Sequence, residues 1–392
     1  MIGAGFQLAA RYAVAAVTGH ITITLSRVLQ MSRRPLDNWA YSDETTVTHM
    51  SVSDVEHLLT PAWHGHLADA GTRTIRRTKM VDATTATSSA ETEITAFTTA
   101  WNALLAQVTT PPTLEQQRQT FDEKHGNVPV PDGCVVDQID DASVYGERLT
   151  PCGADQTRAV IYHHGGGHTF GSVLSHRHLV ARLAESAGIV GFNMGYRLAP
   201  ENPYPAGLDD AVRNYRYVLD QGFAPERIVV AGESAGGNLT AALLLRLQQE
   251  GLPLPAGGYL LSPWLDMTQS GESHIVRAPF DPMITTQGLE NCAIAYCGES
   301  GSRTDPLISP VKGDLSTLPP LLIHVGADEV LLSDSLEFSS RAALSGREVS
   351  MQVWPATVHA WLLFHPELPT VSQAAFTDAG QWIATALQVG NR

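Results

Sequence analysis

The stretch RIVVAGESAGGNLTAALLLRLQQEG at residues 227–251 decides the fold. Its first part, up to Ser234, is apolar and rich in β-branched residues, which predicts a buried strand. Its second part, from Asn238, is rich in leucine and alanine and ends on glycine, which predicts a helix. Between them lies GESAG at 232–236, a G-x-S-x-G at a strand-to-helix turn. We therefore expect a tight, strained turn that presents the Ser234 hydroxyl as a nucleophile.

A second glycine-rich stretch is HHGGGHTFGS at 163–172, which follows another apolar run. Glycines let backbone N–H groups approach a ligand closely, and such groups stabilise the negative oxygen that forms when a carbonyl is attacked. We expect the donors of this oxyanion hole to be the N–H groups of Gly166, Gly167 and Ala235. No Lys-Ser/Thr pair and no G-x-G-x-x-G spacing occurs here, which disfavours a phosphate-binding loop. His164 is expected to fix the loop by hydrogen bonds, with a direct catalytic role as the alternative.

Fifteen histidines occur, so position along the chain must select the catalytic base. Around a nucleophile turn of this kind, the order along the chain is nucleophile, acid, histidine. His359 follows the last predicted strand and the turn after it, and it is our predicted base. His365 is the alternative, whereas His324 lies within an apolar strand and His274 lies in a predicted lid.

The orienting acid should follow the strand before the last, LLIHVG at 321–326. Asp328 comes two residues after this strand. We predict that its carboxylate holds the imidazole of His359 in the productive tautomer and stabilises the imidazolium that forms. Glu329 and Asp334 are the alternatives.

Strand-like and helix-like segments alternate from about residue 128 onward. Several of the strand-like runs are apolar throughout, which predicts an α/β fold with a mostly parallel central sheet flanked by helices. Residues 268–318 lie between two predicted strands and are long enough to form a cap. We therefore expect an N-terminal helical, cap and accessory segment at 1–127 and a catalytic domain at 128–392 that contains the cap insert.

The N-terminal segment has weaker patterns. Apolar residues from Phe6 to Ile21 recur on one side of a helical wheel, which predicts an amphipathic helix. It would pack on its own protein, lie on a membrane surface or serve as an organelle address within residues 1–36. Residues 83–100 are read either as a flexible loop or as a helix of weak helix formers. Thr113 is predicted to cap a helix that follows it.

Taken together, these motifs resemble the hormone-sensitive-lipase branch of the α/β-hydrolases, the microbial and fungal carboxylesterases with an H-G-G-G motif. The supporting stretches are HHGGGHTFGS (163–172), YRLAPENPYPAGLDDA (196–211), GESAGGNLTAALLLR (232–246), LSPWLD (261–266), HVGADEVLLSDS (324–335) and VHAW (358–361). The resemblance covers about 128–392. It implies the triad and oxyanion donors given above, a helical cap, and no metal or organic cofactor.

Three residues depart from what is usual in that family. His168 replaces an aromatic or aliphatic residue, Glu233 replaces the commoner Asp or Thr, and Glu329 stands where Pro often follows the acid. None of these departures removes a catalytic group. We expect His168, Trp264 and Trp361 to line the substrate pocket, with core packing as the alternative for the two tryptophans.

The composition is that of a globular protein, with 43% hydrophobic and 17% charged residues. A formal net charge of −15 disfavours nucleic acid as a partner, because an acidic surface repels phosphates. No apolar run of 18 residues occurs, so we expect no spanning helix and a cytoplasmic location. The four cysteines are expected to be plain thiols, although the pairs Cys134–Cys152 and Cys292–Cys297 remain open.

The function we expect is a serine carboxylic-ester hydrolase that works through an acyl-enzyme on short or medium acyl esters or on a lactone. One alternative is a non-hydrolytic enzyme on the same fold, such as a dehydratase or an acyl-transferring, lactone-forming enzyme. Another is a ligand receptor that has lost catalysis, which the presence of His359 disfavours. The expected partner is a small-molecule ester or lactone, and a homodimer and membrane-surface contact are left open.

Overall fold

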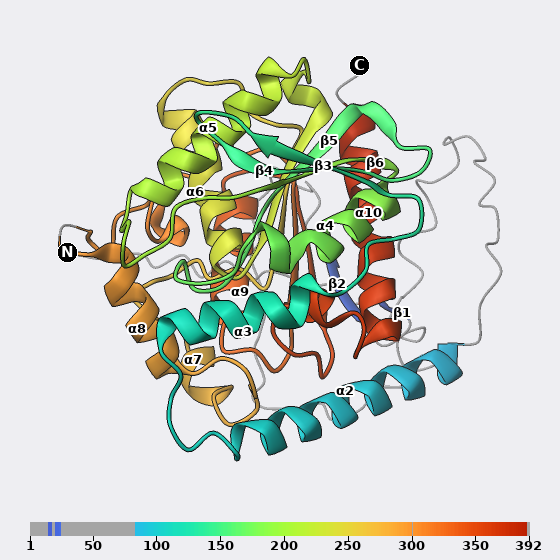
Figure 1. Ribbon diagram of the computed structural model, residues 1–392, viewed down its shortest axis with the longest axis vertical. Coiled ribbons are helices and arrows are strands. Elements are labelled where there is room, and N and C mark those ends of the chain that lie inside the picture. The colour runs from blue at the N-terminus through green and yellow to red at the C-terminus, as the bar shows by residue number, and fades with distance from the viewer. Residues whose placement is uncertain (1–14, 18–19, 25–82, 300, 390–392) are drawn as a thin grey trace, which may run out of the picture. The chain divides into compact units, whose positions relative to one another are not determined.

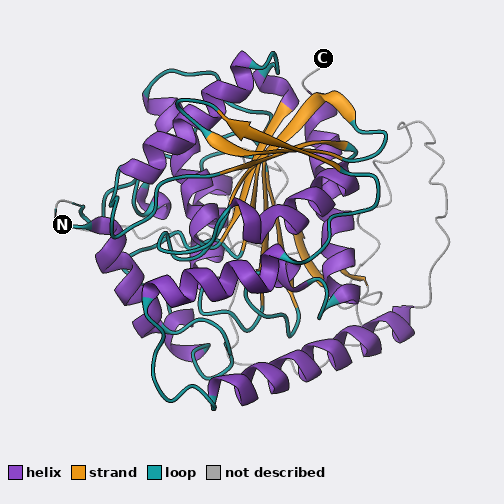
Figure 2. Ribbon diagram, viewed as in Figure 1, coloured by secondary structure: helices purple, strands orange, loops and turns teal. Residues whose placement is uncertain are grey.

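The computed structural model describes residues 15–17, 20–24, 83–299 and 301–389. These residues form a ten-stranded sheet in the order β1-β2-β10-β9-β8-β7-β5-β6-β4-β3. The strands from β10 to β6 in this order pair in parallel, and the pairs at both ends are antiparallel. Figure 2 shows the strands fanning through the middle with helices on either side. The predicted fold class, a mostly parallel sheet flanked by helices, is confirmed.

The bounds of the elements are as follows. The strands are β1 (Ala15–Val17), β2 (His20–Thr24), β3 (Val135–Asp140), β4 (Tyr145–Thr150), β5 (Asp155–His163), β6 (Ile189–Met194), β7 (Ile228–Glu233), β8 (Gly257–Leu261), β9 (Leu321–Gly326) and β10 (Val349–Trp354). The α-helices are α2 (Ala83–Leu105), α3 (Leu114–Gly126), α4 (Val173–Ala187), α5 (Ala206–Asp220), α6 (Ala235–Gln249), α7 (Ser273–Val276), α8 (Thr286–Cys297), α9 (Leu332–Leu344) and α10 (Pro369–Val389). Short 3-10 turns are η2 (Pro225–Arg227), η3 (Pro310–Lys312) and η4 (Trp361–Phe364).

Both faces of the sheet are buried, and strand β5 shows how. Ala159 and Ile161 belong to a hydrophobic cluster with residues of α5, α6 and α9. Val160 and Tyr162 belong to a second cluster with residues of α2, α4 and α10 on the opposite face. In Figure 1, α5 and α6 lie on one side of the strands and α4 and α10 on the other. Because successive side chains of a strand point to opposite faces, double burial explains why these strands read as continuous apolar runs.

The predicted amphipathic helix is wrong where the structure describes its residues. Residues 15–17 and 20–24 are strands, and β2 pairs antiparallel with β10, with Ile23 opposite Met351. The segment HITIT of β2 alternates isoleucine and threonine, and such β-branched residues favour a strand. Pairing with β2 also satisfies the edge of β10, which would otherwise be open. Residues 1–14 lie outside the described residues.

Helices α2 and α3 precede strand β3 along the chain. Residues 83–105 form α2, which resolves the choice between loop and helix, and Glu93 of α2 accepts hydrogen bonds from the N–H and hydroxyl of Thr370 at the start of α10. Thr113 caps α3 as predicted: its hydroxyl accepts from Gln116 N, and Gln116 Oε1 accepts from Thr113 N. α3 packs on α4 and carries Arg118 toward the glycine-rich loop.

The state of the cysteines and the character of the helices can be compared with the expectations from sequence. All four cysteines are free thiols, which confirms the interpretation that they form no disulfide. Within the described ranges, no helix has the length and apolar character needed to cross a bilayer.

Replacing the capping side chain tests how much α3 depends on it. Thr113→Ala removes both the hydroxyl acceptor and its part in the capping box, so we expect the free energy of unfolding to fall by about 1 kcal/mol. Urea unfolding followed by circular dichroism measures this. The control is Thr110→Ala, an exposed threonine outside the helix. Equal effects of the two substitutions would contradict a capping role for Thr113.

Candidate active site

The turn between β7 and α6 holds Ser234 in a strained backbone conformation, with φ 56° and ψ −120°. The flanking glycines are required by space: a Cβ on Gly232 would lie 2.4 Å from the Gly236 oxygen, and a Cβ on Gly236 would lie 2.0 Å from the His163 oxygen. Ser234 N donates to the Leu261 oxygen at 3.0 Å, which fixes the turn against β8. The serine predicted to be the nucleophile therefore lies on the sharp turn that the sequence indicates.

The glycine-rich loop runs from the end of β5 to the start of α4. Gly166 and Gly167 both have positive φ, 104° and 59°, and a Cβ on Gly166 would lie 2.1 Å from the Phe170 oxygen. The Gly166 oxygen accepts from the N–H groups of Thr169 and Phe170, which closes a tight turn. Arg118 of α3 donates to the Thr169 oxygen at 2.8 Å. The loop is thus held both by its own turn and by a helix from outside the sheet.

His359 lies in the segment after β10, and its partner is Glu329. The distance from His359 Nδ1 to Glu329 Oε2 is 2.8 Å, and both side chains are buried. The other carboxylate oxygen of Glu329 accepts from the Ser262 hydroxyl and from Gly326 N. Because Nδ1 is committed to the carboxylate, Nε2 is the ring nitrogen that remains for a proton transfer.

The prediction that Asp328 is the orienting acid is wrong, and the structure supports the alternative, Glu329. Asp328 is partly exposed and lies 3.8 Å from Arg277, away from His359. The turn after β9 folds back so that Glu329 N reaches the Gly326 oxygen, which directs residue 329 inward and residue 328 outward. The third candidate, Asp334, is paired with His274 at 3.1 Å.

The turn that carries Glu329 is tied to the insert between β8 and β9. Val330 N donates to Asp281 Oδ2 at 3.0 Å. Ser273 of α7 donates its hydroxyl to the Val330 oxygen and accepts from Ser333 N. The position of Glu329 therefore depends on residues of the insert as well as on the end of β9.

The fold has a counterpart among known protein families. The sequence model of a family described as having the alpha/beta hydrolase fold matches residues 160–363, which is more than half of the chain. The chain belongs to this α/β-hydrolase family. An acetyl-hydrolase of Streptomyces hygroscopicus is 39% identical over 280 residues, covering 71% of this chain and 92% of that protein. An esterase of Acinetobacter venetianus is 34% identical over 233 residues, covering 59% of this chain and 77% of that protein.

Solved structures indicate which branch of the α/β-hydrolases this chain resembles. An esterase from the bacterial hormone-sensitive lipase family superposes with a TM-score of 0.72 at 34% identity, covering 75% of this chain and 98% of that one. EstE5 soaked with p-nitrophenyl butyrate gives a TM-score of 0.72 at 34% identity, with 76% and 99% coverage. The resemblance to the hormone-sensitive-lipase branch is thereby confirmed.

The electrostatics around the hydrolase's histidine favour its charged form. Burial disfavours the His359 imidazolium, but the hydrogen bond and charge of Glu329, with smaller contributions from Asp281 and Glu233, outweigh it and raise the pKa of His359. Burial raises the pKa of Glu329 as well, against the opposing effect of His359. An imidazolium is the species that forms when a histidine accepts a proton from a serine, so this surrounding suits a general base.

The three residues predicted to line a substrate pocket are instead buried in packed contacts. Trp264 and Trp361 are fully buried, each within a hydrophobic cluster, so the core-packing alternative is correct for both. His168 is 1% exposed and stacks on Tyr296 of α8, with ring centroids 3.7 Å apart. Burial lowers the pKa of His168 to about 3.

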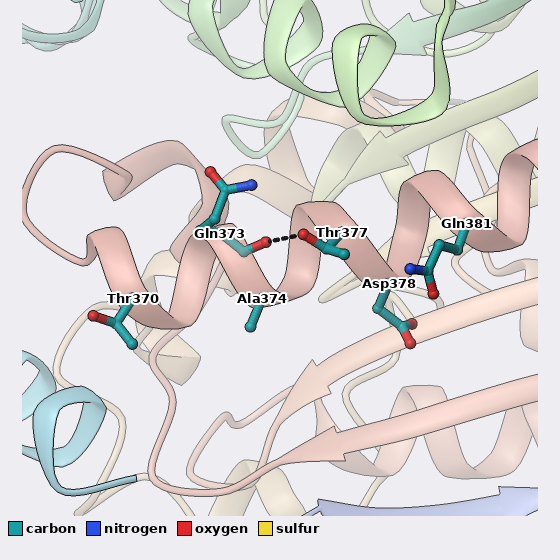
Figure 3. A pocket seen from close by; sticks show the side chains of 6 residues that line it. All are labelled: Thr370, Gln373, Ala374, Thr377, Asp378 and Gln381. Atoms are coloured by element: carbon teal, nitrogen blue, oxygen red, sulfur yellow. Dashed lines mark hydrogen bonds between the residues drawn. The ribbon is translucent and has the colours of Figure 1, made fainter. Parts of the chain in front are cut away.

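Two surface hollows were found elsewhere on the described part of the chain, each of about 520 Å³. One lies along α10 between Thr370 and Gln381, as Figure 3 shows. The other lies between β3, β4 and the start of α4. Neither is lined by Ser234 or His359, the predicted nucleophile and base. In the described ranges, no cluster of three or more His, Cys, Asp or Glu side chains could hold a metal ion.

Paired substitutions separate the two adjacent carboxylates. Glu329→Gln leaves the imidazole without its charged partner, and we expect kcat for p-nitrophenyl acetate to fall by about 10³- to 10⁴-fold. Asp328→Asn is the matched control and should change kcat by less than about threefold, because surface ion pairs contribute little. The opposite ranking of the two variants would restore Asp328 as the acid.

The pH profile gives a second test of Glu329. A general base must be neutral, so the rate falls as the pH falls through the raised pKa of His359. Removing the carboxylate removes the main cause of that raised pKa. The acid limb of kcat/KM should therefore move to lower pH in Glu329→Gln and stay in place in Asp328→Asn. An unmoved limb in Glu329→Gln would contradict the assignment.

Proposed function

We propose that this α/β-hydrolase is a serine esterase that cleaves carboxylic esters through an acyl-enzyme on Ser234. The observation that carries the proposal is the buried His359–Glu329 pair at 2.8 Å, on the same chain as a strained serine turn and a loop of positive-φ glycines. The relatives at 39% and 34% identity are named acetyl-hydrolase and esterase, which supports the same chemistry.

The proposed reaction has two halves. In the first, His359 Nε2 takes the hydroxyl proton of Ser234 while the serine oxygen bonds to the ester carbonyl carbon. The tetrahedral intermediate then breaks its bond to the alkoxy oxygen, and His359 returns the proton to the leaving alcohol. In the second half, His359 activates a water molecule that attacks the acyl-serine, which releases the acid and restores Ser234. Glu329 holds the imidazole throughout.

The oxyanion is proposed to be held by the N–H groups of Gly166, Gly167 and Ala235. Ala235 is the first residue of α6, and the first N–H groups of a helix have no acceptor within the helix. The helix dipole at this end also favours a negative charge. Positive φ at Gly166 and Gly167 turns the backbone of the loop in a way that other residues rarely adopt.

We further propose that the preferred substrates are esters of short acyl chains. Helix α8 of the insert lies against the oxyanion loop: a Cβ on Gly167 would come within 2.5 Å of Cys292 Sγ, and His168 stacks on Tyr296. The side of the loop that faces α8 is therefore filled. The insert, with helices from the N-terminal segment, would act as the cap over the site. The name acetyl-hydrolase of the 39% identical relative agrees with a short acyl group.

Hydrolysis of p-nitrophenyl esters of increasing acyl length tests both parts of the proposal. We expect turnover that is highest for acetate and butyrate and falls for octanoate and longer chains. Ser234→Ala should abolish it, because removing the nucleophile costs on the order of 10⁶-fold in such enzymes. The control is Ser345→Ala, an exposed serine at the end of α9.

Two results would count against the proposal. A folded wild-type protein that shows neither turnover nor a burst of p-nitrophenol on any ester would overturn the esterase function. Full activity in Ser234→Ala would overturn the nucleophile. A rate that rises steadily with acyl length would leave the esterase intact and overturn the short-chain preference.

A further inference from the structure

Glu233, the residue directly before the nucleophile, has a buried carboxylate that contacts two other elements. It ends β7 and is 2% exposed. Its Oε1 accepts a hydrogen bond from the backbone N–H of Gly165 in the oxyanion loop. The same oxygen lies 2.7 Å from Nε2 of His176 in α4. One side chain thus joins the serine turn, the oxyanion loop and the helix that follows the loop.

We propose that Glu233 is a positioning residue that holds the oxyanion loop in register with Ser234. It would act through Gly165 and His176 and would not touch the substrate. The inference rests on the proposed esterase function and extends it by naming what sets the geometry of the oxyanion hole.

The contact with Gly165 is close enough to exclude any side chain there. A Cβ on Gly165 would lie 2.3 Å from Glu233 Oε1 and 3.1 Å from its Cδ, so the carboxylate occupies the space beside this glycine. The length of the side chain matters as well. An aspartate at position 233 would place its carboxylate about 1.5 Å short, one carbon–carbon bond, and would lose the hydrogen bond to Gly165 N.

His176 closes the other end of the loop. It is fully buried in the first turns of α4, and its Nδ1 lies 3.0 Å from the Ser175 hydroxyl and 3.2 Å from the Ser172 oxygen. Ser172 is the N-cap of α4 and marks the end of the loop. Because Gly165 near the start of the loop and His176 just beyond its end both bond to Glu233, the carboxylate fixes the loop from both ends.

The charge of Glu233 also reaches the catalytic histidine. Burial disfavours the carboxylate, but the charge and hydrogen bond of His176, with further contributions from Tyr162 and His164, outweigh it and lower the pKa of Glu233. Glu233 in turn contributes to the raised pKa of His359, after Glu329 and Asp281. The other ionisable groups in its field are Tyr162, His163, His164, Tyr196 and Tyr259.

Two substitutions separate length from charge. Glu233→Asp keeps the charge and loses the reach, whereas Glu233→Gln keeps the reach and an acceptor oxygen and loses the charge. The matched control is Glu147→Gln, which removes the charge of a carboxylate that is 1% exposed, lies on β4 and is paired with Arg177. Each variant is measured for kcat and KM on p-nitrophenyl acetate, for the pH profile, and for inhibition by a trifluoromethyl ketone that forms a tetrahedral adduct with the serine.

The proposal predicts a different pattern for each variant. In Glu233→Asp, kcat should fall by about 10- to 100-fold with KM changed by less than about threefold, because a small misplacement affects the transition state most. The inhibition constant of the ketone should rise by a similar factor. Glu233→Gln should recover most of kcat, and its acid limb of kcat/KM should move to lower pH. Glu147→Gln should leave kcat, inhibition and pH profile unchanged.

Three outcomes would overturn the inference. One is a folded Glu233→Asp with kcat and ketone inhibition within about twofold of wild type, since such a ratio is worth only about 0.4 kcal/mol. Another is a Glu233→Gln that is as impaired as Glu233→Asp with an unmoved pH profile. The third is rapid amide hydrogen exchange at Gly165 in the wild-type enzyme, where a bonded N–H should exchange slowly; this measurement decides the matter even if the variants fail to fold. In each case the esterase function is tested separately: it is supported as long as the wild-type protein hydrolyses esters and this activity depends on Ser234.

Discussion

The backbone of Ser234 is the constraint on which the rest of the site depends. A φ of 56° and a ψ of −120° are costly for a residue with a side chain, and such strain persists only where the surroundings over-determine it. Here the packed elements β7 and α6 hold both ends of the turn. The backbone of residue 163 lies so close to Gly236 that no side chain fits at position 236. The same contact brings the loop after β5 against the turn, so the strain at the serine and the position of the oxyanion loop are set by one packing arrangement.

The pair of Glu329 and His359 is positioned by the sheet, because its members follow the ends of two neighbouring parallel strands. β9 and β10 deliver Glu329 and His359 to the same edge of the sheet, and burial makes their interaction strong. A buried carboxylate is tolerated because its oxygens are satisfied: Ser262 and Gly326 donate to one, and the imidazole occupies the other. Ser262 also accepts from Ala360 N, so one hydroxyl links Glu329 to the residue that follows His359.

Much of this arrangement was predictable from sequence, and the failures have identifiable physical causes. The glycine patterns around Ser234 and in the loop at 163–172 predict these two turns, because only glycine fits the backbone there. The choice between Asp328 and Glu329 depends on how a turn folds back after its strand, and two adjacent carboxylates carry no local signal for that; the absence of a proline at 329 was the available hint. Apolar residues from Phe6 to Ile21 recur with helical periodicity, yet residues 20–24 form strand β2, which pairs with the edge of β10. The sequence gives little indication of the long final helix α10, because its threonines, alanines and glutamines form a weak helical pattern.

The hydrogen bonds between the insert and the turn after β9 have a consequence for how such enzymes diversify. Asp281 and Ser273 belong to the segment that would cover the substrate, yet they bond to Val330, the neighbour of the acid. In the proposed mechanism, the segment that would cover the substrate therefore also supports the turn that carries Glu329. Replacing this segment with that of a relative would change the residues around the acyl group. It would also remove the hydrogen bonds of Asp281 and Ser273 to Val330, which hold the turn that carries Glu329. Evolution of a new substrate range through exchange of this segment requires that the borrowed piece carry its own equivalents of Asp281 and Ser273.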